Sequence, residues 1–269
     1  MDRPPISDLP VISRLEPPTS NDRAEQLLAP CGIDIWIVSL AHAMRLVWCH
    51  PDDERDAARL AGHRSAARLR LRRTAVRSIL AHYVGCDVAE VSITRSSNGK
   101  PTLNAPRIPF EFSATRTRGF ALCAVARAPL GIDAEYRRCL PDAGLLASRI
   151  LTEGEYAAWQ DVAPAIRAER ILSAWTRKEA VLKALGVGLR VPPNVIEVGW
   201  APRSTIRWER LAAEYVLTAR MMPLWLGDVT TRAELVVALA TKECPSAIRV
   251  RNWHSPAEPA LDKFRDRQL

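Results

Sequence analysis

The chain has 269 residues, of which 48% are hydrophobic, and a formal net charge of +8. This length and composition are typical of a globular protein with one sizeable core or two cores of roughly 100 residues each. No apolar run approaches the roughly 20 residues of a membrane span, and the first residues lack the order of a secretion signal, so we expect a cytoplasmic protein. The six widely spaced cysteines show no CxxC pair, which argues against a zinc site or a disulfide framework. The positive charge predicts an acidic partner: nucleic acid, a phosphorylated cofactor or an acidic protein.

The part of the chain before Pro129 predicts a first group of elements. Residues 1–30 carry six prolines and little periodic apolar pattern, which is typical of an extended lead-in. Residues 33–40 alternate and are rich in β-branched side chains, so they predict a strand. Residues 52–83 are rich in Ala, Leu and Arg and contain no Pro, so they predict a helix. The other elements expected here are a short strand at 91–94, a turn at 98–101 and a buried strand at 120–127.

After Pro129 the pattern begins again with a short strand at 132–135. Thr152 and Glu155 fit a capping box, and residues 165–185 predict a long helix that is ended by glycines. Further strands are expected at 195–200, 215–221 and 235–240, and an irregular segment after Glu243. The pattern therefore predicts an α+β protein of two similar halves. Its expected parts are an N-terminal extension (1–30), a first half (31–129), a second half (130–243) and a C-terminal tail (244–269).

Two carboxylates stand close together in the strand expected after Pro129. Asp133 and Glu135 are two residues apart, so on a strand they point to the same face. Oxygen ligands with open positions suit Mg2+, which keeps waters and takes phosphate oxygens from a substrate. The alternative interpretation is a solvated strand edge.

The long helix expected at 165–185 carries a second polar group. Trp175, Glu179 and Lys183 are four residues apart in succession and form one stripe on the helix, with Lys178 beside it. The alternative interpretation is a core tryptophan next to an ordinary surface Glu-Lys pair.

Arginines dominate the first expected helix, in which Arg64, Arg68 and Arg72 share a face. Such a face can bind phosphates through bidentate guanidinium contacts, or it can be a solvated surface. Residues 112–119 combine small hydroxyl side chains, two arginines and a glycine, which predicts either a turn that approaches a phosphate closely or a plain polar loop.

The order and spacing of these segments give them a common interpretation. The sequence resembles the 4'-phosphopantetheinyl transferases of the surfactin-synthetase-activating (Sfp) type, whose signature runs GKP, FNxSHxxG, GIDxE and WxxKEAxxK. The same elements occur here in that order at 99–101, 112–119, 131–135 and 175–183. The resemblance covers about residues 52–198, and the last two motifs match at every defining position.

The resemblance implies a pseudo-dimeric α+β fold of two similar halves, with the active site in the cleft between them. It implies a Mg2+-dependent holo-carrier-protein synthase that moves the phosphopantetheine arm of CoA onto a serine of an acyl or peptidyl carrier protein and releases 3',5'-ADP. Such an enzyme would act as a cytoplasmic monomer, with CoA and an acidic carrier protein as partners and no nucleic acid or membrane. Secondary metabolite biosynthesis is the expected setting.

The resemblance also implies roles for individual residues. Asp133, Glu135 and Glu179 would be the metal ligands. Glu179 and Lys183 would be catalytic, because Glu179 would accept the serine proton and Lys183 would stabilise the leaving nucleotide. The residues expected to bind CoA are Arg64, Arg68, Lys100, Thr115, Arg116 and Lys178.

One segment departs from the family signature: Ser113, Thr115 and Arg116 stand where it has Asn, Ser and His. Arg116 can bind a phosphate with a permanent charge and more donors than histidine. Two other functions stay open at this stage. One is a catalytically impaired relative that binds CoA or a carrier protein, and the other is a nucleic-acid-binding protein that uses the arginine-rich helix.

Overall fold

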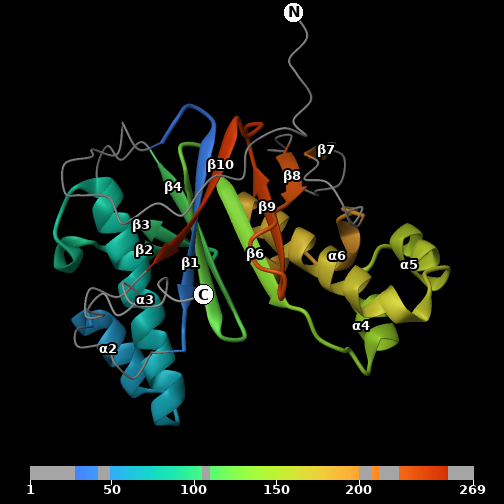
Figure 1. The fold of residues 1–269 in the computed structure, drawn as a ribbon, viewed down its shortest axis with the longest axis horizontal. Coiled ribbons are helices and arrows are strands. Elements are labelled where there is room, and N and C mark those ends of the chain that lie inside the picture. Colours follow the sequence, from blue (N-terminus) through green and yellow to red (C-terminus); the bar gives the residue numbers. More distant parts are fainter. Residues whose placement is uncertain (1–27, 42–48, 105–109, 200–207, 212–223, 254–269) are drawn as a thin grey trace, which may run out of the picture.

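The computed structural model describes residues 28–41, 49–104, 110–199, 208–211 and 224–253. This part of the chain has a mixed α+β fold with two four-stranded sheets (Figure 1). The strands are β1 (Gly32–Ser39), β2 (Ile93–Arg95), β3 (Pro101–Leu103), β4 (Glu111–Thr117), β5 (Phe120–Ala126), β6 (Leu130–Tyr136), β7 (Glu209–Leu211), β8 (Leu224–Asp228), β9 (Leu235–Thr241) and β10 (Ala247–Trp253). The helices are α2 (Pro51–Ala58), α3 (His63–Val84), α4 (Ala143–Ile150), α5 (Glu153–Gln160) and α6 (Pro164–Leu185), with short 3-10 turns at Val88–Glu90, Gly188–Arg190 and Pro193–Val195.

The first sheet has the strand order β10-β1-β5-β4. Its central strand β1 pairs in parallel with β10, where Ile35 is opposite Val250, and antiparallel with β5, where Ile35 is opposite Ala124. The second sheet has the order β6-β9-β8-β7, and in it Asp133 is opposite Ala238. The hairpin of β2 and β3 is a separate two-stranded sheet.

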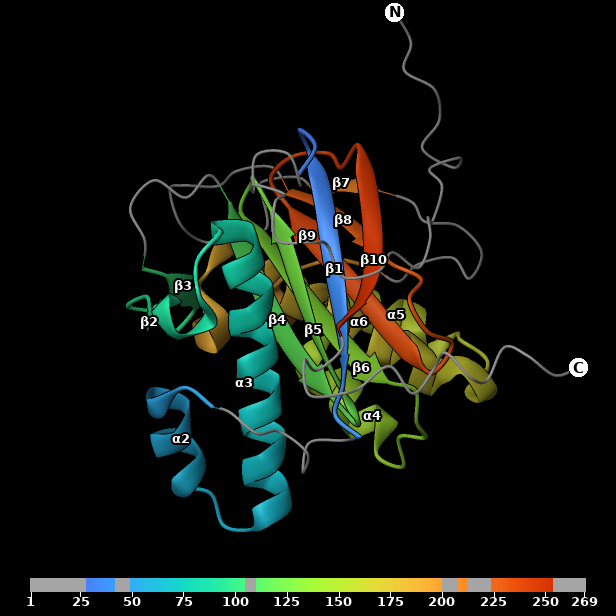
Figure 2. The same ribbon diagram turned by 60° about the vertical axis from the view of Figure 1, so that its left-hand side comes forward.

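The two sheets share an apolar core, and each has a long helix on its other face (Figure 1, Figure 2). Residues such as Ile35, Leu122, Ile132 and Leu239 fill the core between the sheets. Alternate side chains of the first sheet pack with α3, and alternate side chains of the second sheet pack with α6. The period of two in the strands therefore produces the layer order helix, sheet, sheet, helix.

Most elements expected from the sequence are present in the structure. The strands predicted at 33–40, 120–127, 132–135 and 235–240 are β1, β5, β6 and β9. The Thr152–Glu155 capping box begins α5, and α6 ends at Gly186, whose φ is +69°. The α+β class is thus confirmed. Within the described segments, every helix is too short or too polar to cross a lipid bilayer.

Four predictions about local structure were wrong. The single helix expected at 52–83 is two helices, because the chain leaves the helical conformation at Gly62, whose φ is +102°. The polar loop expected at 112–119 is mostly strand β4. Residues 195–200 form no strand in their described part, which contains a 3-10 turn and extended chain. The segment after Glu243 was expected to be irregular. It contains β10, which pairs with β1, a strand near the start of the described chain.

The remaining expectations about local structure lie outside the described residues. They are the proline-rich lead-in up to residue 27, the strand at 215–221 and the tail beyond residue 253.

Candidate active site

Strand β6 and helix α6 approach each other very closely at Gly131. A Cβ atom added there would lie 2.1 Å from the Ala180 carbonyl oxygen and 2.4 Å from the Ala184 nitrogen. Real Cβ atoms are not found at such distances, so this crossing requires glycine. The close approach brings the polar stripe of α6 directly against the carboxylates of β6.

Asp133 is the centre of the polar contacts at this crossing. Its side chain is nearly buried, and its Oδ1 atom accepts a hydrogen bond of 2.7 Å from the Thr115 hydroxyl of β4. The Lys183 Nζ of α6 forms an ion pair of 2.7 Å with the same oxygen and also contacts the Ile132 carbonyl at 3.3 Å. Elements from both sheets and from α6 therefore meet at one carboxylate oxygen.

Glu179 lies on the same side of α6 as Lys183. Burial raises the pKa of Glu179, the Lys183 charge opposes this shift, and the carboxylates of Asp133 and Glu135 raise the pKa further. The Asp133 and Glu135 charges act on Glu179, so both carboxylates lie near it. The Glu179 Oε1 atom is buried and has no hydrogen-bond partner among the described residues. A buried carboxylate oxygen without a donor favours a cation or a donor supplied from outside the protein.

Glu135 is more exposed than Asp133 and forms an ion pair of 2.8 Å with Arg138. In the described residues, no three His, Cys, Asp or Glu side chains are arranged closely enough to hold a metal ion together. In this arrangement the positive charge next to Asp133 is the ammonium group of Lys183. The carboxylates are thus grouped, but Asp133 is paired with an amino group of the protein.

Strand β4 explains why residues 112–119 carry alternating hydroxyl groups. Ser113 Oγ accepts a hydrogen bond from the Ile132 nitrogen at 3.1 Å, and Thr117 Oγ1 accepts one from the Tyr136 nitrogen at 2.8 Å. Thr115, between them, donates to Asp133. Every second side chain of β4 therefore binds the edge of β6 and satisfies its polar groups. Thr115 was expected to bind CoA directly, and its described contact is with Asp133.

The other face of β4 lines a cavity of about 330 Å3 between α2, α3 and the β2–β3 hairpin. Phe112 and Ala114 lie in its wall, together with Arg72 and Arg95. Arg116 alternates with Thr115 along β4 and repels the Arg72 charge, so it lies near this cavity. Thr115 also lines the cavity, and its hydroxyl group binds the Asp133 carboxylate.

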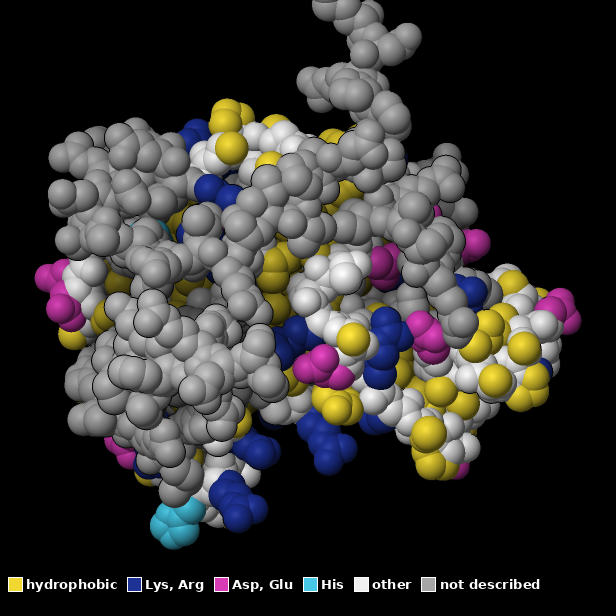
Figure 3. All heavy atoms as spheres, in the orientation of Figure 1, with side chains coloured by type: hydrophobic (Ala, Val, Ile, Leu, Met, Phe, Trp, Pro, Cys, Tyr) yellow, Lys and Arg dark blue, Asp and Glu magenta, His cyan; other side chains and the backbone are white. Residues whose placement is uncertain are grey.

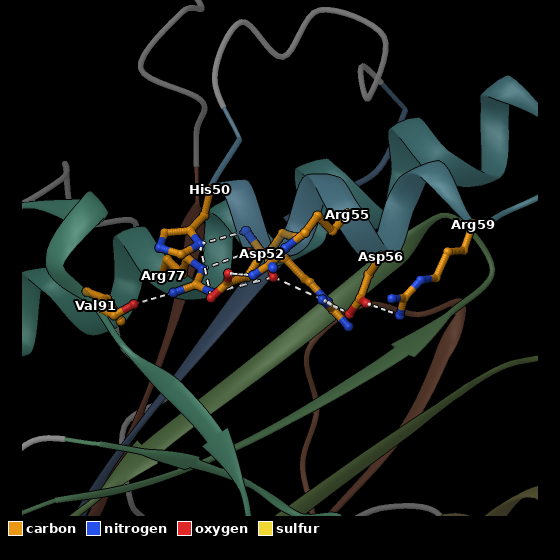
Figure 4. A network of polar contacts seen from close by, with 9 residues as sticks. His50, Asp52, Arg55, Asp56, Arg59, Arg77 and Val91 are labelled. Atoms are coloured by element: carbon orange, nitrogen blue, oxygen red, sulfur yellow. Dashed lines mark hydrogen bonds and ion pairs between the residues drawn. The ribbon is translucent and has the colours of Figure 1, made fainter.

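Acidic helix α2 is held against α3 by ion pairs (Figure 4). Asp53 is buried between Arg73, at 2.9 Å, and Arg77, at 2.6 Å, and Arg77 also donates to the Val91 carbonyl. Asp56 forms a second ion pair of 2.6 Å with Arg73. Several arginines of α3 therefore have a structural role that their pattern in the sequence did not reveal.

The two arginines of α3 that the sequence predicted to bind CoA do not line the cavity next to β4. Arg64 and Arg68 are exposed, whereas Arg72, one turn beyond Arg68, is half-buried in the cavity wall. Figure 3 shows Lys and Arg side chains gathered along the lower edge of the molecule, where α3 begins in Figure 1.

Lys100 lies at the turn of the β2–β3 hairpin, close to Gly186 at the end of α6. Its Nζ atom donates a hydrogen bond of 3.2 Å to the Leu130 carbonyl at the start of β6. Burial lowers the pKa of Lys100. Arg190, from the turn after α6, binds the same hairpin through the Asn98 side chain at 2.5 Å. The hairpin thus connects the first half of the chain to β6 and to the end of α6.

Lys178 has a different environment from the one expected. It is fully buried, and its Nζ atom pairs with Glu155 at 2.6 Å and donates to the carbonyls of Pro193 and Ile196. These three contacts use all the donors of an ammonium group. Lys178 was expected to contact CoA; its described contacts connect α6 to α5 and to the 193–196 turn.

Comparisons with known proteins show what the segment that contains β6 and α6 is similar to. Residues 129–236 match the model of the 4'-phosphopantetheinyl transferase superfamily. This match confirms the resemblance stated from the sequence motifs.

Three curated relatives carry the name 4'-phosphopantetheinyl transferase. The protein HetI of a Nostoc species is 34% identical over 117 residues, which are 42% of this chain and 49% of HetI. A transferase of Bacillus subtilis is 29% identical over 124 residues, covering 46% of this chain and 54% of the relative. The protein gsp of Aneurinibacillus migulanus is 25% identical over 119 residues, covering 44% and 48%. The chain thus matches about half the length of these relatives.

Proposed function

We propose that this chain, whose residues 129–236 match the 4'-phosphopantetheinyl transferase superfamily, moves the phosphopantetheine arm of CoA onto a serine of a carrier protein. One observation carries the proposal: Asp133, Glu179 and Lys183 converge where β6 crosses α6. These residues belong to the two motifs that match the family signature in full, and they come from distant parts of the sequence.

Asp133, Glu135 and Glu179 would hold Mg2+, which when bound would offset the negative charge of the CoA pyrophosphate. The buried Glu179 Oε1 without a hydrogen-bond partner among the described residues supports this assignment, as does the effect of the Asp133 and Glu135 charges on the Glu179 pKa. Carboxylate oxygens are the ligands that Mg2+ prefers, and phosphate oxygens and water would complete the set. Lys183 would exchange its contact with Asp133 for one with the pyrophosphate.

In the proposed reaction, the carrier serine oxygen attacks the phosphorus next to the pantetheine arm. The serine proton passes to Glu179, whose raised pKa suits a proton acceptor. The bond between this phosphorus and the oxygen of 3',5'-ADP breaks, and the electron pair stays on the leaving phosphate. Lys183, whose ammonium group is paired with Asp133, would donate to that oxygen and offset the developing charge.

CoA would lie between the two halves of the chain, which we propose are related as a pseudo-dimer. The layer order of α3, two sheets and α6 supports this arrangement, as does the position of Lys100 beside Leu130. Lys100 and Arg116 would bind phosphate oxygens of CoA. Thr115 would fix the orientation of Asp133. Because one chain supplies every residue of this site, we propose that a monomer is active, and a cytoplasmic location remains a prediction.

The test is mass spectrometry of a panel of apo carrier proteins after incubation with CoA, Mg2+ and this chain. We expect at least one carrier to gain the mass of one phosphopantetheine, on serine, and EDTA to prevent the gain. Glu179→Gln serves as the matched variant: it is nearly isosteric, so it should fold normally and lose transfer. An absence of modification on every carrier, together with calorimetric CoA binding and no release of 3',5'-ADP, would instead identify an impaired CoA-binding relative.

A further inference from the structure

Two of the three proposed metal ligands are paired with cations of the chain itself. Asp133 Oδ1 lies 2.7 Å from Lys183 Nζ, and Glu135 Oε2 lies 2.8 Å from Arg138 Nη1. Glu179 differs from both, because its buried Oε1 atom has no hydrogen-bond partner in the described part of the chain. Lys183 and Arg138 therefore bind carboxylate oxygens that a divalent cation would use.

Arg138 is placed to leave its carboxylate easily. It follows the end of β6 at Tyr136, and 47% of its side chain is exposed, compared with 27% for Lys183. The Nη1 atom that binds Glu135 also donates to the Tyr136 carbonyl at 3.3 Å. Because the guanidinium group borders on solvent, water can replace the carboxylate as its partner without opening a buried space.

The adjacent Arg137 has other partners. Its backbone nitrogen donates to the Glu234 carbonyl at 2.8 Å, next to the pairing of β6 with β9, and its side chain forms an ion pair of 2.6 Å with Glu169 of α6. Arg137 and Arg138 are both exposed and carry the same charge. They differ in the contact with Glu135, so comparing them separates a direct contact from a general effect of charge.

The guanidinium group on Glu135 and a divalent cation are alternatives. The charges of Asp133 and Glu135 act on Glu179, so these carboxylates repel one another when they are ionised. Arg138 offsets one of these charges, and a cation bound by all three carboxylates would offset the whole group through the same oxygen of Glu135. An exposed ion pair contributes little stability, so Arg138 can weaken metal binding without preventing it.

We propose that Arg138 competes with the divalent cation for Glu135, so that it weakens the binding of metal to the nucleotide-free chain and is released when the cation binds. This proposal rests on the transferase function proposed above. It adds a residue outside the proposed set of metal ligands that sets their affinity for the metal. Arg138 acts through Glu135 and is therefore a positioning residue.

The experiment is titration of the full chain with Mn2+, whose free form is counted by its electron paramagnetic resonance signal. Mn2+ takes the same carboxylate and water ligands as Mg2+. Arg138→Gln should tighten Mn2+ binding about three- to fivefold, which is the size expected for an exposed ion pair. Arg138→Lys keeps a cation beside Glu135 and should stay within about twofold of the wild type. In a Glu135→Gln background, Arg138→Gln should have no further effect, because the shared carboxylate is gone.

Arg137→Gln is the matched control, because it removes the same charge from the adjacent exposed residue. It should change Mn2+ affinity by less than about twofold. Equal tightening in the Arg137→Gln and Arg138→Gln chains would overturn the proposal, because a general change of charge would explain both. So would an Arg138→Gln chain whose affinity for Mn2+ is unchanged or too weak to measure.

Labelling with phenylglyoxal, which modifies arginine, measures the release of Arg138 directly. Tandem mass spectrometry should show Arg138 labelled faster with Mn2+ than with EDTA, and Arg137 labelled at the same rate in both. A rate for Arg138 that does not respond to Mn2+ would contradict the release.

Carrier-protein modification is measured separately from metal binding. Transfer by the wild-type chain, combined with no tightening of Mn2+ binding in Arg138→Gln, would refute this inference and leave the proposed function intact. Tighter Mn2+ binding in Arg138→Gln, combined with no modified carrier, would refute the proposed function and leave the competition at Glu135 standing.

Discussion

The Thr115 hydroxyl donates a hydrogen bond of 2.7 Å to Asp133 Oδ1 and so joins strand β4 of the first sheet to strand β6 of the second. The same oxygen is paired with Lys183 from α6. Asp133 is therefore held from two sides before any ligand is bound. This contact gives Thr115 a positioning role, which is distinct from the CoA contact expected from its motif.

Replacing Thr115 by Val should remove this hydrogen bond while keeping the shape of the side chain. Loss of a donor to a buried carboxylate is expected to cost about 1–3 kcal/mol of unfolding free energy. Transfer should fall about tenfold through kcat, since the orientation of Asp133 is lost. Urea unfolding and steady-state kinetics measure the two effects. Thr115→Ser keeps the hydroxyl and should restore both, and a Ser variant as impaired as the Val variant would contradict the positioning role.

Replacing Gly131 by Ala should separate β6 from α6. The new Cβ would meet the Ala180 carbonyl at 2.1 Å, and both elements must move to relieve this overlap. Overpacking of this kind costs about 1–3 kcal/mol or more, and transfer should drop because Lys183 and Glu179 shift away from Asp133. Thermal unfolding and the carrier-modification assay follow the two consequences.

Gly154→Ala is the control for that substitution. Gly154 is exposed in α5, and no atom lies within 4 Å of a Cβ added there. Alanine in a helix is favoured over glycine by about 0.5–1 kcal/mol, so this variant should be at least as stable as the wild type. If Gly131→Ala were as well tolerated as Gly154→Ala, the close crossing of β6 and α6 would be wrong.

The pair of Lys178 and Glu155 should matter for stability and little for CoA affinity. Lys178→Met leaves Glu155 as a buried carboxylate without its cation, which is expected to cost about 3–5 kcal/mol. The double variant with Glu155→Gln should recover part of this loss, because it removes the uncompensated charge. Denaturant unfolding tests the stabilities. A raised KM for CoA in a Lys178 variant of unchanged stability would indicate that Lys178 binds CoA.

Cys123 should resist alkylation in the native protein. It is fully buried in β5, and burial raises the pKa of its thiol to about 12, so the reactive thiolate is nearly absent at pH 8. Raising the pH from about 7 to about 9 should speed modification of the exposed Cys139 and leave Cys123 unmodified. Peptide mass spectrometry after iodoacetamide treatment separates the two sites. Reaction of Cys123 at the rate of Cys139 in the folded chain would contradict its burial.

The sequence predicted those parts of the fold that depend on local pattern. Strand β1 has strong alternation, and α5 and α6 have clear capping and terminating residues at Thr152 and Gly186. The same local signals also exposed the Asp133 and Glu179 motifs. The two motifs lie close together because β6 crosses α6 at Gly131. The family resemblance predicted that they meet, whereas the periodicity of the sequence did not.

What the sequence did not reveal depends on long-range partners. Strand β10 looks irregular in isolation, because its pairing with β1 is fixed by contacts such as the Arg249 ion pair with Asp34. The burial of Lys178 was not evident from the sequence, because its partner Glu155 belongs to another helix. The hydroxyl groups of β4 alternate with a period of two, and this signal could have identified the strand.

The parallel pairing of β10 with β1 has a consequence for how the protein is made. Residues 247–253 complete a sheet whose central strand is built from residues 32–39. During synthesis the first sheet therefore lacks a neighbouring strand until almost the whole described chain has left the ribosome, although α3 and the β4–β5 hairpin have long been available. Nascent chains stopped before residue 247 would present an open edge of β1, which is a site for chaperones or for aggregation.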